Sequence, residues 1–265
     1  MNASIIGAGK VSTEHIRAYQ SAGVHVAAVC SRTVVGAERK CHECGIRADV
    51  YDTIDAMLAR DDIDVVSACF PPELHAAHVV AAARAGKHLA IEKPVALNEW
   101  ELSEMLDAVA KAGVFTIVGF VLRWNSLVEN IRLSLPMLGT IFYLETDYWH
   151  GSSHERRHAS HEYGTRATPI GAFLGGGCHA VDMARYLTGA DIAEIQARTP
   201  CNRDLRALRV QRTTVALANM TNGAIAKISA TDAVFMPYWF NIQVFGTSGA
   251  IRNDGDGNDD DDDDF

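Results

Sequence analysis

Residues 3–12 read Ala3-Ser4-Ile5-Ile6-Gly7-Ala8-Gly9-Lys10-Val11-Ser12, and this stretch decides the fold of the 265-residue chain. A short apolar strand runs into two glycines, and residues 13–21 then follow the pattern of a helix. Glycines in these places permit a tight turn and a close approach of the backbone to a pyrophosphate, at which the helix directs its first N–H groups. Ser12 replaces a third glycine and is still small enough for helix and strand to pack closely. We therefore expect a dinucleotide to bind at this turn, on Gly7, Gly9, Lys10 and Val11.

The end of the next expected strand, at residues 24–30, bears on which dinucleotide binds. About 20 residues after the glycines, an NAD site usually carries Asp or Glu for the ribose 2′-hydroxyl. This chain has Ser31 and Arg32 there and no carboxylate. A small hydroxyl followed by arginine suits a 2′-phosphate through the charged fork of the guanidinium; the alternative is that Arg32 is an ordinary surface residue of the loop. We expect NADP(H) in preference to NAD(H).

Strand and helix patterns continue to alternate up to residue 118. Repeated units of this length predict a doubly wound parallel sheet. Residues 1–118 should therefore form one α/β dinucleotide-binding domain of the Rossmann type. Its further strands are expected at 64–69, 88–91 and 115–118, and its further helices at 54–60, 73–85 and 98–112.

Glu92-Lys93-Pro94 stands where the apolar run His88–Ile91 ends. Open parallel sheets bind ligands outside the carboxyl ends of their strands, so a lysine and a carboxylate here are well placed for chemistry. Proline restricts the residue before it, and an X-Pro bond can be cis at modest cost. The alternative is that Lys93 is a solvated loop lysine and Pro94 an ordinary helix-start residue.

After Gly119 the sequence changes to strands joined by turns, with little helix between them. This pattern predicts an α+β domain over residues 119–252 with a mostly antiparallel, open sheet. Its helices are expected at 127–138 and 178–187, and its strands at 141–149, 192–198, 212–219, 224–231 and 239–245.

His179 and Asp182 lie three residues apart on the second of these helices and therefore share one of its faces. The run Gly175-Gly176-Gly177 just before them would let backbone and ligand come close. Histidine is the side chain best suited to exchange a proton near neutral pH, so His179 is a candidate general acid/base. The alternative is a helix-start histidine whose hydrogen bonds are satisfied by the backbone.

Charge and composition exclude some classes of partner. The formal net charge is -9, but eight aspartates lie between Asp254 and Asp264, so the rest of the chain carries about -1. A nearly neutral body gives no electrostatic argument for binding nucleic acid or a membrane surface. No apolar run approaches the ~20 residues that span a bilayer. Residues 253–265 repel one another and are expected to form a disordered acidic tail.

Six scattered cysteines and the lack of a basic leader before the first strand predict a cytoplasmic protein without a disulfide framework. Two patterns resemble metal sites. The first, His150, His154, His158 and His161, is interrupted by Gly151-Ser152-Ser153, which argues for a loop. The second, Cys41-His42-Glu43-Cys44, lacks the further pair of ligands that a structural zinc site needs. We expect no metal.

Five motifs follow one another along the chain. The most specific is Ala-Gly-Lys-His-Leu-Ala-Ile-Glu-Lys-Pro at residues 85–94. The others are Gly-x-Gly-x-x-Ser at 7–12, Phe-Pro-Pro-Glu-Leu-His at 70–75, Phe-Val-Leu-Arg-Trp at 120–124 and Gly-Gly-Cys-His-Ala-Val-Asp at 176–182. In this order they resemble the Gfo/Idh/MocA oxidoreductase family, and the resemblance covers about residues 3–252.

The resemblance implies hydride transfer between a nicotinamide cofactor and a sugar, cyclitol or related polyol, and a second domain whose open sheet often forms homo-oligomers. Carried onto this sequence, Lys93 would hold the reacting oxygen and His179 would be the general acid/base. Asp182 would orient the histidine helix or the substrate. Glu92 and Pro94 would shape the nicotinamide end, Phe70, Pro71 and His75 would line the cofactor, and Arg123 and Trp124 would form the rim toward the substrate.

Two departures from the family pattern leave other functions open. Many members carry an aspartate four residues before the histidine, where this chain has Gly175, and many continue well beyond residue 252 with more strands and a closing helix. A catalytically weakened, NAD(P)-binding sensor or regulatory protein of the same fold is therefore the main alternative. Another Rossmann dehydrogenase, acting on amino acids or ring imines, fits the residues after the Glu-Lys-Pro strand less well.

Overall fold

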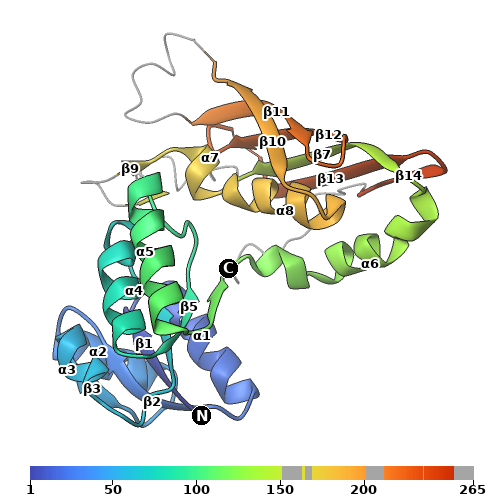
Figure 1. Cartoon of the computed structure of the whole chain (residues 1–265). Helices are drawn as coiled ribbons and strands as arrows, with labels where there is room; N and C mark the ends of the chain where they lie inside the picture. The colour runs from blue at the N-terminus through green and yellow to red at the C-terminus, as the bar shows by residue number, and fades with distance from the viewer. Residues whose placement is uncertain (151–162, 165–168, 201–211, 235, 254–265) are drawn as a thin grey trace. The chain divides into compact units, whose positions relative to one another are not determined.

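The computed structural model describes residues 1–150, 163–164, 169–200, 212–234 and 236–253. The chain divides into two compact units, Met1–Gly119 and Phe120–Phe265 (Figure 1). Most of the expected acidic tail, from Asp254 on, lies outside the described residues, as do three of the four histidines that were weighed as metal ligands: His154, His158 and His161.

The first unit is built on a six-stranded parallel sheet, which confirms the predicted doubly wound fold. The strand order β3-β2-β1-β4-β5-β6 reverses between β1 and β4. In open parallel sheets, ligands bind outside the carboxyl ends of the strands at such a reversal. The strands are β1 (Asn2–Ile6), β2 (His25–Cys30), β3 (Asp49–Tyr51), β4 (Val65–Ala68), β5 (His88–Ile91) and β6 (Thr116–Val118).

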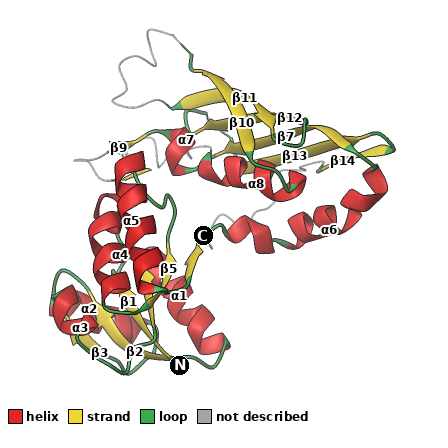
Figure 2. Cartoon of the chain, viewed as in Figure 1, coloured by secondary structure: helices red, strands yellow, loops and turns green. Residues whose placement is uncertain are grey.

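Helices cover this sheet on both faces (Figure 2), and each face has its own apolar core. One core gathers around Ile5 and Ile16, and the other around Val66 and Val79; all four side chains are fully buried. Glycine and polar residues between the apolar positions concealed α2 and β3, which the sequence did not predict. The helices are α1 (Lys10–Ser21), α2 (Val34–Glu43), α3 (Ile54–Leu58), a 3-10 turn η1 (Pro72–Leu74), α4 (His75–Arg84) and α5 (Glu99–Ala112).

The second unit contains a mixed six-stranded sheet in the order β10-β11-β12-β7-β13-β14. Only the β12–β7 pair is parallel among the described strands of this sheet, so the prediction of a mostly antiparallel sheet is confirmed. The strands are β7 (Ile141–Trp149), β10 (Ile192–Arg198), β11 (Thr213–Met220), β12 (Ile225–Thr231), β13 (Trp239–Gly246) and β14 (Gly249–Arg252), beside a small pair β8 (Tyr163–Gly164) and β9 (Pro169–Ile170). The helical segments are η2 (Val121–Trp124), α6 (Ser126–Ser134), η3 (Leu135–Leu138), α7 (Ala172–Gly175) and α8 (Cys178–Thr188).

Helix α8 packs against β7 and β12 on one face of this sheet (Figure 1). Its Met183 is buried in one cluster with Leu144 of β7 and Ile228 of β12. Thr146 of β7 also faces the helix, because its hydroxyl donates a hydrogen bond to the Ala180 carbonyl at 3.0 Å. Since side chains alternate along a strand, Glu145 and Asp147 must point to the opposite face.

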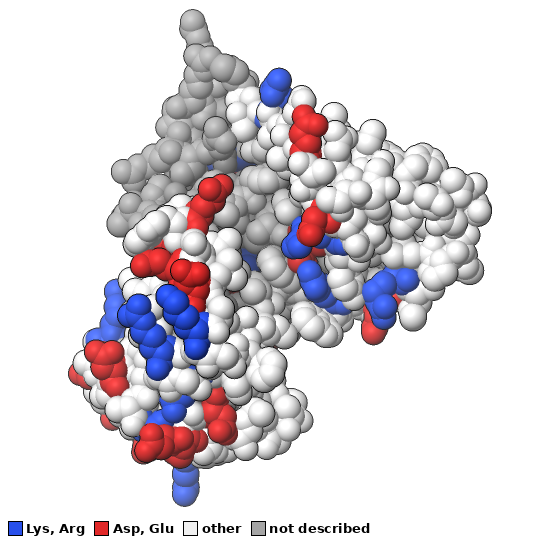
Figure 3. Space-filling model, viewed as in Figure 1, with Lys and Arg blue, Asp and Glu red and all other residues white. Residues whose placement is uncertain are grey.

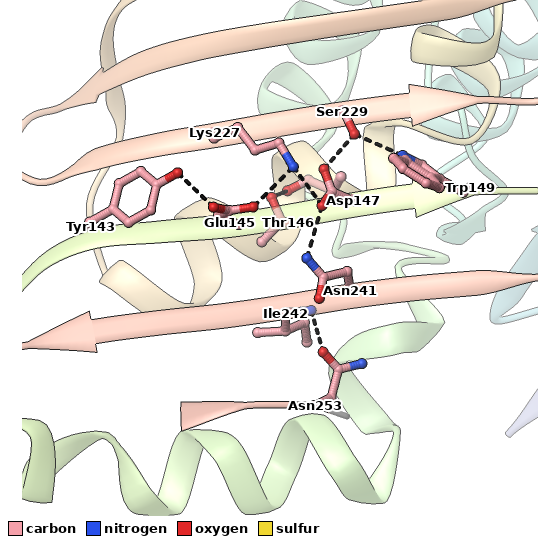
Figure 4. Close-up of polar contacts among 11 residues, drawn as sticks. Tyr143, Glu145, Thr146, Asp147, Trp149, Lys227, Ser229, Asn241, Ile242 and Asn253 are labelled. Carbon is pink, nitrogen blue, oxygen red and sulfur yellow. Dashed lines mark hydrogen bonds and ion pairs between the residues drawn. The ribbon is translucent and has the colours of Figure 1, made fainter. Parts of the chain in front are cut away.

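That opposite face carries a connected set of polar side chains around Asp147, which is almost completely buried (Figure 4). Lys227 Nζ lies 2.8 Å from Asp147 Oδ2 and 3.0 Å from Glu145 Oε2. Asn241 donates to Asp147 Oδ2 at 2.9 Å, and the Ser229 hydroxyl donates to its other oxygen. The centre of the face is thus an ion-pair network whose hydrogen bonds are satisfied within the chain.

Surface charge follows the expectation of a nearly neutral body. On the face drawn in Figure 3, Lys and Arg side chains lie among Asp and Glu side chains and form no patch of one sign. The longest described helix in the first unit, α5, has 14 residues. Within the described part of the chain, no helix is both long and apolar enough to cross a membrane.

Candidate active site

The expected cofactor residues of the first unit follow one row of residues across the parallel sheet. Ile6 is in register with Cys30 on one side and with Ala68 on the other, and Ala68 is in register with Ile91. The residues after this row continue the ladder through backbone hydrogen bonds: Gly7 N to Cys30 O at 2.8 Å, Cys69 N to Ile6 O at 2.9 Å and Glu92 N to Ala68 O at 3.2 Å. Three expected cofactor segments, at 7–11, 70–71 and 92–94, therefore leave the same edge of the sheet.

The glycine turn has the shape that a bound pyrophosphate needs. Gly7 has φ +106°, and a Cβ built on it would lie 2.0 Å from the Cys69 carbonyl oxygen, so only glycine fits there. Gly9 is different: no atom lies within 4 Å of its added Cβ. Its Cα faces open space at the N-terminus of α1, where helix N–H groups favour an anion. The chain thus fits a dinucleotide at this turn.

Lys10 and Val11 form the first turn of α1 and are both exposed, as a ligand contact requires. Ser12, behind them, is fully buried and donates a hydrogen bond to the Gly9 carbonyl at 2.7 Å. Its small side chain lets the helix approach the sheet, which is the role that the sequence assigned to it.

The loop after β2 presents Ser31 and Arg32 at the same edge. The Ser31 hydroxyl donates to the Thr33 carbonyl at 2.7 Å, and Thr33 caps α2 by accepting from the Gly36 amide at 3.1 Å. Arg32 is exposed and forms no ion pair with the described residues. Asp52 directly follows the neighbouring strand β3, and the sequence analysis did not single it out. Burial and the negative charge of Asp52 together raise the pKa of the Cys30 thiol to about 11.

His75 connects two of the loops that were expected to line the cofactor. Its ring is fully buried, with Nδ1 3.1 Å from the Val95 carbonyl oxygen and Nε2 3.0 Å from the Phe70 carbonyl oxygen. Burial lowers the pKa of His75 from its ordinary value, against the opposite effect of these carbonyls. His75 therefore holds the loops after β4 and β5 together, and Phe70 and Pro71, which are partly exposed, remain the residues available to a ligand.

The Lys93–Pro94 peptide bond is cis, and Glu92 before it accepts hydrogen bonds at both carboxylate oxygens. Oε2 accepts from the Lys93 amide at 3.2 Å, and Oε1 lies 2.9 Å from Nε2 of His15 on α1. Burial by itself raises the pKa of Glu92, but the hydrogen bond and charge of His15, with the Lys93 amide, hold it below its ordinary value. Glu92 is thus a carboxylate with two fixed oxygens beside Lys93.

Two further features around Glu92 were missed by sequence reasoning. His15 lies within the helix that follows the glycines, and its spacing from Gly9 carries no known signal for a contact 77 residues away. Gly119 ends the first unit directly against the carboxylate, and a Cβ built on it would lie 3.0 Å from Glu92 Oε1.

In the second unit, His179 lies in the first turn of α8 between aromatic rings. It is 4% exposed and stacks on Tyr148 with ring centroids 5.2 Å apart. Its ring and that of Phe120 form a T-shaped pair with centroids 5.9 Å apart. Tyr238 approaches Tyr148 in turn, with centroids 5.2 Å apart. The sequence did not single out Tyr148, although its alternation with Leu144 and Thr146 on β7 would have placed it on the face of α8.

Of the three expected substrate residues, Arg123 and Asp182 form an ion pair, whereas the ring of Trp124 is exposed. Arg123 holds both carboxylate oxygens of Asp182, at 2.8 and 2.5 Å, and its guanidinium lies 4.8 Å from the centre of the Tyr186 ring. Asp182 is 4% exposed. Trp124, in contrast, is 64% exposed. Asp182 therefore fixes Arg123 against α8, whereas Trp124 is open to a ligand.

Gly177, the last glycine of the run before α8, leaves room for the close packing of neighbouring segments. A Cβ on Gly177 would lie 2.6 Å from the Phe173 carbonyl oxygen and 2.7 Å from the Ala230 side chain on β12. The sequence attributed this run to ligand approach, but at Gly177 the space is occupied by the chain itself. Gly175 and Gly176 are also buried.

The parallel sheet, its glycine turn and the second unit with a mixed sheet define a dinucleotide-binding protein of two domains. The profile of the Gfo/Idh/MocA oxidoreductase family with an NAD-binding Rossmann fold matches residues 1–120, and that of the Gfo/Idh/MocA C-terminal domain matches residues 136–252. The chain belongs to the Gfo/Idh/MocA family, as its motifs predicted.

The chain is also similar to individual proteins, at 22–32% identity in the three examples that follow. The chain is 32% identical to the uncharacterized oxidoreductase YrbE of Bacillus subtilis over 75% of its own length and 57% of that protein's length. It is 25% identical to myo-inositol 2-dehydrogenase of Thermotoga maritima over 96% of its length and 75% of the relative's. The structure of scyllo-inositol dehydrogenase from Lactobacillus casei with NAD(H) and scyllo-inositol has the same fold, with a TM-score of 0.84, 22% identity, and coverage of 96% of this chain and 76% of that one.

Proposed function

We propose that this chain transfers a hydride between NADP(H) and a carbinol or carbonyl carbon of a sugar, cyclitol or related polyol. The observation that carries the proposal is the shared edge at which the glycine turn, Phe70-Pro71 and Glu92-Lys93-Pro94 leave the parallel sheet. The family supports the reaction class, and the names of the inositol dehydrogenases among its relatives support the substrate class.

In the proposed mechanism, Lys93 and His179 are the two reacting side chains. The nicotinamide, when bound, accepts or delivers the hydride. Lys93 binds the substrate oxygen and stabilises the negative charge that develops on it. His179 takes the hydroxyl proton during oxidation and returns it during reduction. Pro94 and Glu92 shape the nicotinamide end, and Arg123, Trp124 and Asp182 shape the substrate side.

NADP(H) is the proposed cofactor because Arg32 is exposed beside Ser31, where a 2′-phosphate would meet its charge. Asp52 is the feature that opposes this assignment, since a carboxylate at this edge could bind the ribose hydroxyls of NAD instead. The two cofactors are separated by measuring their dissociation constants.

The test of the reaction uses a panel of inositols, aldoses and glucosides, with formation or loss of the reduced cofactor measured by absorbance. We expect turnover with at least one polyol. K93M should lower kcat by about 10²- to 10³-fold, while the dissociation constant of NADPH changes little. Turnover retained in K93M would overturn the assignment of Lys93.

A cofactor-binding sensor of the same fold is the second candidate. It is favoured by Gly175, which stands on α7 where many members of the family carry an aspartate, and by the capture of the Asp182 carboxylate by Arg123. This function predicts NADPH binding without turnover of any substrate in the panel, and a polyol that changes cofactor affinity without being oxidised.

We also propose that a second copy of this chain covers the polar face of the second unit's sheet. Val215, Leu217 and Ile225 are each 44–56% exposed on β11 and β12. Leu217 is in register with Lys227 and Val215 with Ser229, so apolar side chains flank the ion-pair network on the same face. L217K should shift the protein toward the monomer in analytical ultracentrifugation; a monomeric wild-type protein would contradict the proposal.

A further inference from the structure

Four side chains from α1, β4 and the loop after β5 form one hydrogen-bonded chain in the first unit. The Tyr19 hydroxyl lies 2.9 Å from Ser67 Oγ, and Ser67 Oγ lies 3.1 Å from His15 Nδ1. His15 Nε2 then lies 2.9 Å from Glu92 Oε1. Tyr19 and His15 are four residues apart on α1 and therefore share a helix face. The chain thus runs from the helix of the glycine turn to the residue before Lys93.

The hydrogen bonds from Tyr19 through Ser67 and His15 to Glu92 can all donate in the same direction. A carboxylate only accepts hydrogen bonds, so Nε2 of His15 must carry the proton that is shared with Glu92. In a neutral imidazole, Nδ1 then accepts, and it can accept from the Ser67 hydroxyl. The Ser67 oxygen is left to accept from Tyr19, whose pKa is raised by burial, so that its phenol remains a donor. With a neutral ring, every proton points toward Glu92; with a charged ring, His15 still donates to Glu92 through Nε2.

We propose that His15 is a positioning residue that orients Glu92 through Nε2 and thereby fixes the Glu92-Lys93-Pro94 turn for the reaction proposed above. The second carboxylate oxygen of Glu92 already accepts from the Lys93 amide at 3.2 Å, so His15 determines the rotation of the carboxylate about this contact. Because His15 also belongs to α1, it ties the catalytic turn to the helix that receives the pyrophosphate. No contact of His15 with substrate or cofactor is needed for this role.

Two isosteric substitutions separate the two contacts of the ring. H15Q keeps a donor at the position of Nε2 and loses the contact with Ser67, whereas H15N keeps a group at the position of Nδ1 and loses the donor to Glu92. With a polyol from the panel, H15N should lower kcat by about 10- to 100-fold, the range expected for a misplaced reacting group. The KM for NADPH should change less than about threefold. H15Q should retain kcat within about fivefold, since the donor to Glu92 remains.

A purely structural histidine gives a different pattern. It would make both variants lose thermal stability together and leave kcat unchanged, or lower kcat equally in both. Either result overturns the proposal. Equal melting temperatures with kcat lowered in H15N alone support it.

A second readout does not depend on turnover and so separates this proposal from the proposed function. Carbon-13 labelling of glutamate carboxyl groups, with E92Q to identify the resonance, reports the titration of Glu92 in the full chain. The other titratable groups that face Glu92 are Lys93, Cys69 and His75, and all are kept in both variants. H15N should raise the pKa of Glu92 more than H15Q, because only H15Q keeps the hydrogen bond, although both variants lose the charge of the ring. If the wild-type protein turns over no substrate, this result still supports the positioning of Glu92 by His15; an unchanged Glu92 pKa in H15N overturns it.

Discussion

Arg123 and Asp182 form a two-point ion pair in the second unit, from Nε to Oδ2 at 2.8 Å and from Nη2 to Oδ1 at 2.5 Å. The Asp182 side chain is 4% exposed and that of Arg123 is 34% exposed. Replacing the arginine leaves a buried carboxylate without its cation, which is more costly than loss of the pair as a whole. We expect R123M to lower the free energy of unfolding by about 2–3 kcal/mol, measured by urea denaturation.

The chain supplies two controls for this prediction. D182N removes the buried charge and should be less destabilising than R123M. Arg185, on the same helix, pairs with Asp191 at the surface, and both side chains are about half exposed or more. R185M should therefore change stability by less than about 1 kcal/mol. Equal losses in R123M and R185M would show that the buried pair contributes nothing beyond a surface pair.

Gly7 and Gly9 should respond differently to the same substitution. In G7A, the new methyl group would overlap the Cys69 carbonyl at a positive φ, and we expect a loss of about 3 kcal/mol or more in stability. In G9A, the methyl group meets no atom of the protein, so stability should be unchanged. It occupies the space expected for the pyrophosphate, and NADPH affinity should fall at least about tenfold. Thermal denaturation and fluorescence titration with NADPH measure the two effects; a G9A protein that binds NADPH normally contradicts the assignment of the turn.

Arg32 and Asp52 test the proposed preference for NADP(H). R32A removes a charge-assisted contact with a 2′-phosphate and should weaken NADPH binding about 10- to 100-fold, while NADH binding changes little. R39A is the matched control, because Arg39 is an exposed arginine on the following helix, α2. If the wild-type protein prefers NADH and D52N abolishes that preference, then Asp52 binds the ribose and the proposed preference is wrong.

Lys227 should stabilise the second unit in a way that depends on pH. Burial lowers the pKa of Lys227, but its hydrogen bonds to Asp147 and Glu145 outweigh this and raise it. A raised lysine pKa contributes stability that is complete below the ordinary value of about 10.4 and is lost as pH rises through the folded value. K227M leaves Asp147 buried and unpaired, so at pH 7 it should cost about 2–3 kcal/mol.

At acid pH, Glu145 of the same network gives a second limb of the stability curve, in which stability is lost as pH falls. Burial raises the pKa of Glu145, but Lys227 and Tyr143 hold it below its ordinary value. Its contribution is therefore complete above about pH 4.3 and is lost as pH falls through the lowered folded value. Urea unfolding from acid to alkaline pH should show both limbs in the wild-type protein. In K227M both limbs should be smaller but not absent, because Tyr143 still lowers the pKa of Glu145, the pKa of Glu92 stays lowered, and the pKa of Cys30 stays raised. The exposed Lys111 on α5 serves as the control, and a K111M protein should keep both limbs.

The sequence was sufficient for most of the fold because the apolar runs are short and end in glycine, proline or polar residues. The strands at His88–Ile91 and Ile141–Trp149 were predicted with the bounds observed. Helix α2 and strand β3 were missed because α2 begins with Val34-Val35-Gly36 and contains Lys40, a charged residue that is buried through contacts with Thr13 and Glu43. The contact with Thr13 spans 27 residues and leaves no periodic pattern in the sequence.

For the candidate site, the sequence predicted which segments follow the strand ends but not the partners of their side chains. The carboxyl ends of β1, β4 and β5 were predictable because the strands run into a glycine turn, a Phe-Pro-Pro break and a Glu-Lys-Pro motif, respectively. The pairing of Arg123 with Asp182 was not predictable, since the two residues are 59 positions apart and each was interpreted separately. His75 was expected to line the cofactor, whereas full burial between two backbone carbonyls makes it a link between loops.

Gly119 has a consequence for how much the chain tolerates mutation. Segments that join compact units usually accept substitutions freely. At this junction, however, the backbone of the last residue of the first unit lies against the Glu92 carboxylate, and even a methyl group would come within 3.0 Å of its Oε1. At the end of the first unit, the lack of room beside the Glu92 carboxylate therefore restricts a residue that has no side chain at all.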